Sequence, residues 1–170
     1  MKVKFAVKTL IAIIGFVPVI AFASTDLVLS EGNITMSTQN LLEGKIVRIY
    51  ANVTNPGTED LRGLVRFYDG SSQIGGDQPV SAIAHKDDAV FIDWEPGPGE
   101  HALRVTLVPF DPKKDDTSNN SVTKIVEVLA DSDHDGIPNS TDSDDDNDGV
   151  PDEQDAFPLN RNESIDSDGD

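Results

Sequence analysis

The segment from residue 131 to residue 157, "DSDHDGIPNSTDSDDDNDGVPDEQDAF", repeats itself with a step of thirteen residues. In each copy an Asp-x-Asp-x-Asp run is followed by a glycine, an aliphatic residue and a proline. The first copy begins at Asp131 and the second at Asp144, and a third begins at Asp166 as "DSDGD". A tail that served only solubility would need charge but no such register, so the repeat indicates a periodic structure.

Aspartates at alternate positions are the pattern of a calcium-binding loop. Ca²⁺ takes roughly six to eight oxygens, and a loop supplies them from positions 1, 3 and 5, a carbonyl at 7, a group at 9 and a carboxylate at 12, with glycine at 6. Both full copies have this register, with Asp in place of the usual Glu at position 12. The predicted ligands of the first copy are Asp131, Asp133, Asp135, the carbonyl of Ile137, Asn139 and Asp142. Those of the second copy are Asp144, Asp146, Asp148, the carbonyl of Val150, Asp152 and Asp155, and the third copy offers Asp166, Asp168 and Asp170.

The context of these loops argues against an EF-hand, because no amphipathic helices flank them and Pro138 and Pro151 lie inside them. The pattern D-x-D-x-D-G-x-P-[ND]-x-x-D, present twice and followed by "FPLN", resembles thrombospondin type 3 repeats. The resemblance covers residues 131–170 and implies a chain that wraps around successive calcium ions with little conventional secondary structure. Animal members of that family are stapled by cysteines, which this chain lacks, so the ions and Phe157 would have to order the segment.

The alternative is a disordered acidic linker. Residues 131–170 hold fifteen Asp and Glu against Arg161 alone, within a chain whose formal net charge is −18. Without calcium we expect the disordered state, because adjacent carboxylates repel. With calcium we expect a stiff rod whose ordering is coupled to ion binding, at the ~10⁻⁴–10⁻³ M affinity usual for extracellular modules. The charge excludes nucleic acid and anionic membrane surfaces as partners.

Residues 24–130 show apolar alternation with a period of two. "KIVRIYANVT" (45–54) is the clearest case, and "LVRFYDG", "AVFIDWE", "HALRVTLVPF" and "SVTKIVEVLA" follow the same pattern. "DLVLS" and "NITMS" are shorter candidate strands, while "TNPGTED", "YDGSSQIGGDQP", "EPGPGEH" and "DPKKDDTSNN" are predicted to be turns or loops. About seven short strands without helices predict an all-β, immunoglobulin-like antiparallel β-sandwich, because each half-buried sheet needs a second sheet to cover it.

The same region resembles the CARDB family, the cell-adhesion-related domain found in bacteria, over about residues 26–129. The resemblance is carried by the "NVTNPGT" turn, the "VRFYDG" strand end, the tryptophan-containing strand and the "SNN" before the final strand. These motifs are turn and core residues, so they imply a fold rather than an activity. Members of the family are extracellular sandwich modules, often arranged in multidomain surface proteins.

Residues 1–23 are predicted to be a signal peptide. Lys2, Lys4 and Lys8 precede the apolar run "TLIAIIGFVPVIAFA", whose last residues offer a cleavage site before Ser24. The alternative is an uncleaved N-terminal anchor; after cleavage we expect no membrane insertion. The chain has no cysteine, which excludes disulfides and a lipid-modified cysteine.

No catalytic constellation is recognisable in the sequence. His85, His101 and His134 lie far apart along the chain, and none belongs to a nucleophile motif. We expect an exposed or capping role for His101. Trp94 is expected in the core rather than as a sugar-stacking ring, with Asp93 on the solvent face. The chain is therefore expected not to be an enzyme.

These patterns divide the chain into a signal peptide (1–23), a sandwich (24–130) and calcium-binding repeats (131–170). Because the third repeat stops within a loop, we expect the chain to be the front of a longer protein. We expect an exported calcium-binding adhesion or spacer protein, extracellular or periplasmic, whose sandwich has a cell-surface protein or a polysaccharide as its candidate partner. The alternatives are accessory modules of an exported protease or polysaccharide hydrolase, or an envelope protein anchored by a missing C-terminal part.

Overall fold

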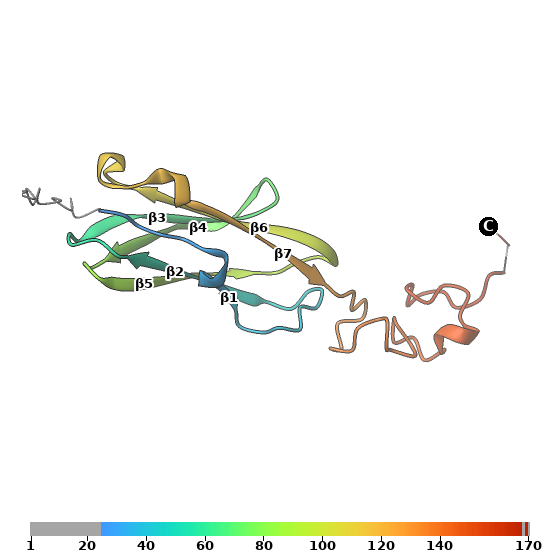
Figure 1. The fold of residues 1–170 in the computed structure, drawn as a ribbon. Helices are drawn as coiled ribbons and strands as arrows, with labels where there is room; N and C mark the ends of the chain where they lie inside the picture. The colour runs from blue at the N-terminus through green and yellow to red at the C-terminus, as the bar shows by residue number, and fades with distance from the viewer. Residues whose placement is uncertain (1–24, 168, 170) are drawn as a thin grey trace, which may run out of the picture.

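The computed structural model describes residues 25–167 and residue 169, so the predicted signal peptide lies outside the described residues. Two antiparallel sheets pack face to face and are followed by an irregular tail (Figure 1). The first sheet has the order β1-β2-β5 and consists of β1 (Ile34–Met36), β2 (Val47–Asn55) and β5 (Lys86–Trp94). The second has the order β4-β3-β6-β7 and consists of β3 (Leu61–Asp69), β4 (Ser72–Ala82), β6 (Gly99–Pro109) and β7 (Ser121–Val128). The predicted immunoglobulin-like β-sandwich is confirmed.

The helical structure in the described residues consists of short 3₁₀ turns. These are η1 (Glu31–Asn33), η2 (Pro112–Lys114), η3 (Thr117–Asn119) and η4 (Asp152–Gln154). In the described part of the chain, no helix has the length and apolar character needed to cross a membrane.

The core lies between the two sheets and follows from the alternation along the strands. The inward residues of β2 are each at most 1% exposed, and they are Val47, Ile49, Ala51 and Val53. Val47 pairs with Trp94 of β5, which is 6% exposed, so the prediction of a core tryptophan is confirmed. The opposite sheet contributes Val65 and Phe67 from β3 and Leu103 from β6, all nearly fully buried. Apolar burial of this kind is the main stabilising contribution to the sandwich.

One predicted loop is instead a strand. The segment "YDGSSQIGGDQP" was expected to be a turn, but the turn is confined to Gly70 and Ser71, and β4 begins directly after it. Most of β4 faces solvent, and Val80 and Ala82 are its buried residues. The prediction was wrong because glycines and exposed polar residues hide the alternation of a strand in this sequence. The segment is nevertheless a strand, because its backbone pairs with β3. The short candidate strand "DLVLS" forms only a bridge from Val28 to Thr54.

The turn after β2 is organised by a buried asparagine. Asn55 is 0% exposed, and its Nδ2 donates to the carbonyls of Glu59 and Ala82, each at 2.8 Å. Its Oδ1 accepts from the N–H of Gly57 at 3.0 Å. One side chain thus connects the end of β2 to the turn before β3 and to the end of β4, which explains why the "TNPGT" turn carries Asn at this position.

We predict that Asn55→Ala lowers the free energy of unfolding of the sandwich by about 2–4 kcal/mol, because it leaves buried backbone groups without partners. Urea unfolding followed by Trp94 fluorescence measures this change. The matched control is Asn52→Ala on the solvent side of β2, where the side chain donates to Asp87 at 3.2 Å. It is expected to change stability by less than about 0.5 kcal/mol, and equal effects of the two substitutions would contradict the assignment.

Candidate metal centres

The aspartates predicted to share a cation are brought together in the tail. We call residues 131–142 loop 1 and residues 144–155 loop 2. In loop 1 one carboxylate oxygen from each of Asp131, Asp133 and Asp135 lies within 4.8 Å of the others. In loop 2 the same holds for Asp144, Asp146 and Asp148. Two oxygens on opposite sides of a Ca²⁺ ion are about 4.6–5.2 Å apart, because each lies about 2.3–2.6 Å from the ion. Both clusters are therefore compact enough to fit around one Ca²⁺ ion.

The two loops have the same hydrogen bonds at a spacing of thirteen residues. The first aspartate accepts from the glycine N–H, at 3.2 Å for Asp131 and Gly136 and at 3.1 Å for Asp144 and Gly149. The second aspartate accepts from the backbone of the third, and the third accepts from the N–H two residues beyond it. In loop 1, Asp135 N donates to Asp133 at 2.9 Å and Ile137 N donates to Asp135 at 2.7 Å. In loop 2, Asp148 N donates to Asp146 at 3.0 Å and Val150 N donates to Asp148 at 2.7 Å. The sequence repeat is thus also a structural repeat.

Two positions in each loop have positive φ. The predicted glycine at position 6 is one of them, with φ of 103° at Gly136 and 96° at Gly149. Position 4 is the other, with φ of 63° at His134 and 56° at Asn147. The role of position 4 was missed in the sequence, although Asn is a residue type enriched in this conformation. These two turns curl the chain so that side chains at positions 1, 3 and 5 converge.

The predicted position-9 residues hold the loops closed from within. Asn139 Oδ1 accepts from the N–H of Ser132 at 2.9 Å, and Asp152 Oδ1 accepts from the N–H of Asp145 at 2.9 Å. These oxygens brace the start of each loop and lie outside the three-carboxylate clusters. The second oxygen of Asp152 has no corresponding bond among the described residues, so this position remains a predicted ligand in loop 2.

The predicted position-12 residues connect each loop to the chain that follows. Asp142 Oδ1 accepts from the N–H groups of Ser143 and Asp144, and Asp155 Oδ1 accepts from that of Phe157 at 2.7 Å. Asp155 Oδ2 is buried and has no hydrogen-bond partner among the described residues. The charge of Asp155 is one of the causes that raise the pKa of Asp146. In the third copy Asp166 accepts from Gly169 N, while Asp168 and Asp170 lie outside the described residues.

Loop 2 contains carboxylate oxygens that lack a donor. Asp146 is only 5% exposed, and its Oδ2 is buried without a hydrogen-bond partner in the described structure, as is Asp144 Oδ1. Burial, together with the charges of Asp148, Asp155 and Asp144, raises the pKa of Asp146. Burial and the charge of Asp152 raise the pKa of Asp145 in the same way. Buried anionic acceptors of this kind fit a hard divalent cation, which would satisfy them and balance their charge.

The carbonyls of Ile137 and Val150 follow directly after these clusters, as position 7 requires. The donor set is made only of oxygens and the chain has no cysteine, so it favours Ca²⁺, Mg²⁺ or Mn²⁺ over soft metals. Irregular loops with many carboxylates suit the flexible coordination of Ca²⁺ better than the strict octahedron of Mg²⁺.

The histidines have structural roles at separate places. His101 lies with Nδ1 2.7 Å from Asp69 Oδ2 and Nε2 2.9 Å from the carbonyl of Gly97, and its ring packs edge-on against Trp94. Its side chain is largely buried and holds the turn before β6 through the Gly97 carbonyl, so of the two expected roles, exposed or capping, the structure fits the capping one. His85 lies in the turn between β4 and β5, where its N–H donates to Gly57.

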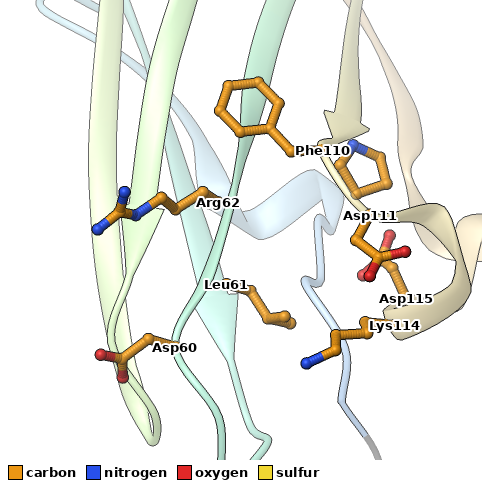
Figure 2. Close-up of a pocket in the computed structure, with 8 residues that line it drawn as sticks. Asp60, Leu61, Arg62, Phe110, Asp111, Lys114 and Asp115 are labelled. Atoms are coloured by element: carbon orange, nitrogen blue, oxygen red, sulfur yellow. The ribbon is translucent and has the colours of Figure 1, made fainter.

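A pocket lies at the end of the sandwich away from the tail, and Figure 2 shows its lining between the start of β3 and the loop after β6. Its charged groups hold this end together. Asp115 accepts from the N–H of Leu27 at 2.6 Å and from Asn120 Nδ2 at 2.6 Å, and Lys114 pairs with Glu59 at 2.6 Å.

Comparison with known proteins supports the fold. No protein-family model and no curated protein matches the chain. The crystal structure of the CARDB domain of the PF1109 protein from Pyrococcus furiosus, in complex with di-metal ions, aligns with a TM-score of 0.51 and 20% identity, over 64% of this chain and 91% of that one. The fold is that of a CARDB domain. A solution structure of the same Pyrococcus furiosus domain aligns with a TM-score of 0.48 and 19% identity, over 63% of this chain and 97% of that one.

We predict opposite effects of acid on the tail with and without calcium. A carboxyl group whose pKa is raised in the folded loop destabilises that loop when ionised, and this destabilisation is relieved as the pH falls through the raised pKa. Calcium binds only the ionised form, so protons compete with it. Acidification from neutral pH to about pH 4.5, just above the usual aspartate pKa, is expected to protect the ion-free tail and to deprotect the calcium-loaded tail. Amide hydrogen exchange at Asp148 and Gly149, corrected for intrinsic rates, measures both, and the same direction in both states would contradict the assignment.

Proposed function

We propose that this chain is an exported, non-catalytic adhesion or spacer module in which a CARDB-like sandwich is carried on a calcium-binding stalk. The observation that carries the proposal is the repetition of one loop structure, in which three carboxylates converge at a spacing of thirteen residues. The resemblance of residues 131–170 to thrombospondin type 3 repeats and the predicted signal peptide support it further. The Pyrococcus furiosus domain with the same fold was also crystallised with metal ions.

In this proposal Ca²⁺ is the ion of each loop. Asp131, Asp133 and Asp135 bind one ion, with the Ile137 carbonyl and Asp142 completing the shell. In loop 2 the corresponding ligands are Asp144, Asp146, Asp148, the Val150 carbonyl, Asp152 and Asp155. Calcium at extracellular concentrations, matched to the ~10⁻⁴–10⁻³ M affinity of such modules, would load both loops.

The sandwich is the part proposed to contact a partner, a cell-surface protein or a polysaccharide. The side chains of His101 and of the pocket residue Asp115 serve structural bonds, which supports a role in binding or spacing rather than catalysis. The ion-loaded repeats would hold the sandwich away from whatever the stalk is joined to. A calcium-dependent stalk of this kind is stiff outside the cell and remains unfolded until the ion is available.

Calcium titration calorimetry of residues 24–170 tests the proposal. We predict about two bound ions, with Asp133→Ala and Asp146→Ala each removing one, because each substitution deletes a ligand from a different loop. The matched control is Glu153→Ala, which removes an exposed acid outside both clusters and is expected to leave two ions bound.

The same samples are subjected to limited proteolysis of the tail with calcium and with a chelator. Protection by calcium is expected in the wild-type chain. Absence of stoichiometric binding at millimolar calcium, together with an unprotected tail, would show that the aspartates form only a solvated linker.

A further inference from the structure

Loop 1 is joined to the sandwich by a short segment before β2, residues 41–45, which we call the clasp. Its first part pairs with the end of the last strand: Leu129 N donates to the carbonyl of Leu41 and Glu43 N donates to that of Leu129, both at 2.9 Å. Leu41 is 4% exposed and belongs to the core. Gly44 N donates to the carbonyl of Pro96 at 3.2 Å, two residues after Trp94. The clasp is therefore part of the folded sandwich.

The other side of the clasp contacts loop 1 directly. Lys45 Nζ donates to the carbonyl of His134 at 2.8 Å and lies 4.0 Å from Asp131 Oδ2. Glu43 Oε2 lies 3.4 Å from the N–H of Asp131. The ring of His134 packs on Gly44 so closely that a Cβ there would lie 3.0 Å from the ring. These contacts hold Asp131 and the turn at His134, which together form the start of loop 1.

Asp131 is both a predicted ion ligand of loop 1 and a residue that contacts the clasp. It is 0% exposed, although it is a carboxylate and a predicted first ligand of loop 1. Its burial depends on the clasp, since the Lys45 ammonium group and the Glu43 side chain lie against it. If the sandwich unfolds, this arrangement is lost and the carboxylate returns to water.

Loop 2 has no such attachment in the described structure. Two of its hydrogen bonds go to other parts of the tail. Asn147 Nδ2 donates to Asp133 of loop 1, and the later residue Arg161 donates to the carbonyl of Asn147 at 3.2 Å. Among the described residues, no hydrogen bond or ion pair joins loop 2 to a strand or to the clasp. The two loops therefore have the same internal hydrogen bonds but differ in their contacts with the sandwich.

We propose that ion binding in loop 1 is thermodynamically linked to the folding of the sandwich through the clasp, whereas ion binding in loop 2 is not. The inference rests on the calcium sites of the proposed function. A cation among the loop 1 carboxylates binds most tightly when Asp131 and the His134 backbone are held in place, and the clasp holds both only in the folded sandwich. By reciprocity, calcium in loop 1 stabilises the sandwich by the same factor by which the folded sandwich raises the affinity of loop 1.

Thermal unfolding of the sandwich, followed by the fluorescence of Trp94, tests the linkage. Trp94 is the only tryptophan of the chain and lies in the core, so its signal reports the sandwich and not the tail. At calcium about tenfold above the dissociation constant, the wild-type midpoint is expected to rise by about 5–10 °C relative to a chelator. Asp146→Ala, which empties loop 2, is expected to keep this shift, and Asp133→Ala, which empties loop 1, is expected to lose it.

A second variant separates the attachment from the ion site. A short Gly-Ser insertion between Leu129 and Ala130 leaves every predicted ligand in place but moves loop 1 away from Lys45 and Gly44. We expect it to bind about as many ions as the wild-type chain by calorimetry, while calcium no longer raises the Trp94 midpoint.

The outcomes distinguish this inference from the proposed function. If calorimetry shows ions in both loops and the Trp94 midpoint does not move, the linkage is wrong and the calcium sites stand. If the insertion variant keeps the full midpoint shift, or if Asp146→Ala abolishes it, the clasp is not the connection. If no ion binds at all, the proposed function itself fails.

Discussion

Mutual repulsion among carboxylates is the constraint on which the tail depends. Three aspartate oxygens lie within 4.8 Å of one another, twice in succession, and like charges this close repel one another unless a positive charge balances them. The apolar residues of the tail offer little to oppose this repulsion, since Ile137, Leu159 and Ile165 are all largely exposed. The tail thus differs from the sandwich in what holds it together: buried apolar faces stabilise the sandwich, whereas the tail uses backbone turns and, in the proposed function, a bound ion.

Much of the sandwich could be predicted from the sequence because its strongest signals are local. The alternation along β2 and the position of Trp94 were read correctly, since a half-buried strand shows its period directly. Strand β4 was missed because Gly75, Gly76 and Pro79 suggest a turn, and because its pairing with β3 is a backbone property that side-chain periodicity does not report. The buried role of Asn55 also depends on carbonyls that come from the turn before β3 and from the end of β4.

The candidate site shows the same division between local and distant information. The convergence of Asp144, Asp146 and Asp148 follows from a loop register that a single stretch of sequence contains. The contacts of Lys45 and Gly44 with His134 join residues about ninety positions apart, and no local pattern marks them. The hydrogen bonds of Asn139 and Asp152 to the loop backbone were likewise not predictable, because the same residue type can bind either an ion or a backbone N–H group.

The near absence of a spacer between the two loops has a consequence for the evolution of this kind of chain. Asp142 closes loop 1 and at the same time caps the turn into loop 2, so one repeat ends where the next is already being oriented. Loop 2 thus follows loop 1 at one defined step along the chain, as neighbouring units do in linear repeat arrays. The third copy begins twenty-two residues after the second, so the step of thirteen holds between loops 1 and 2. There, an insertion or deletion would separate loop 2 from the turn that Asp142 caps.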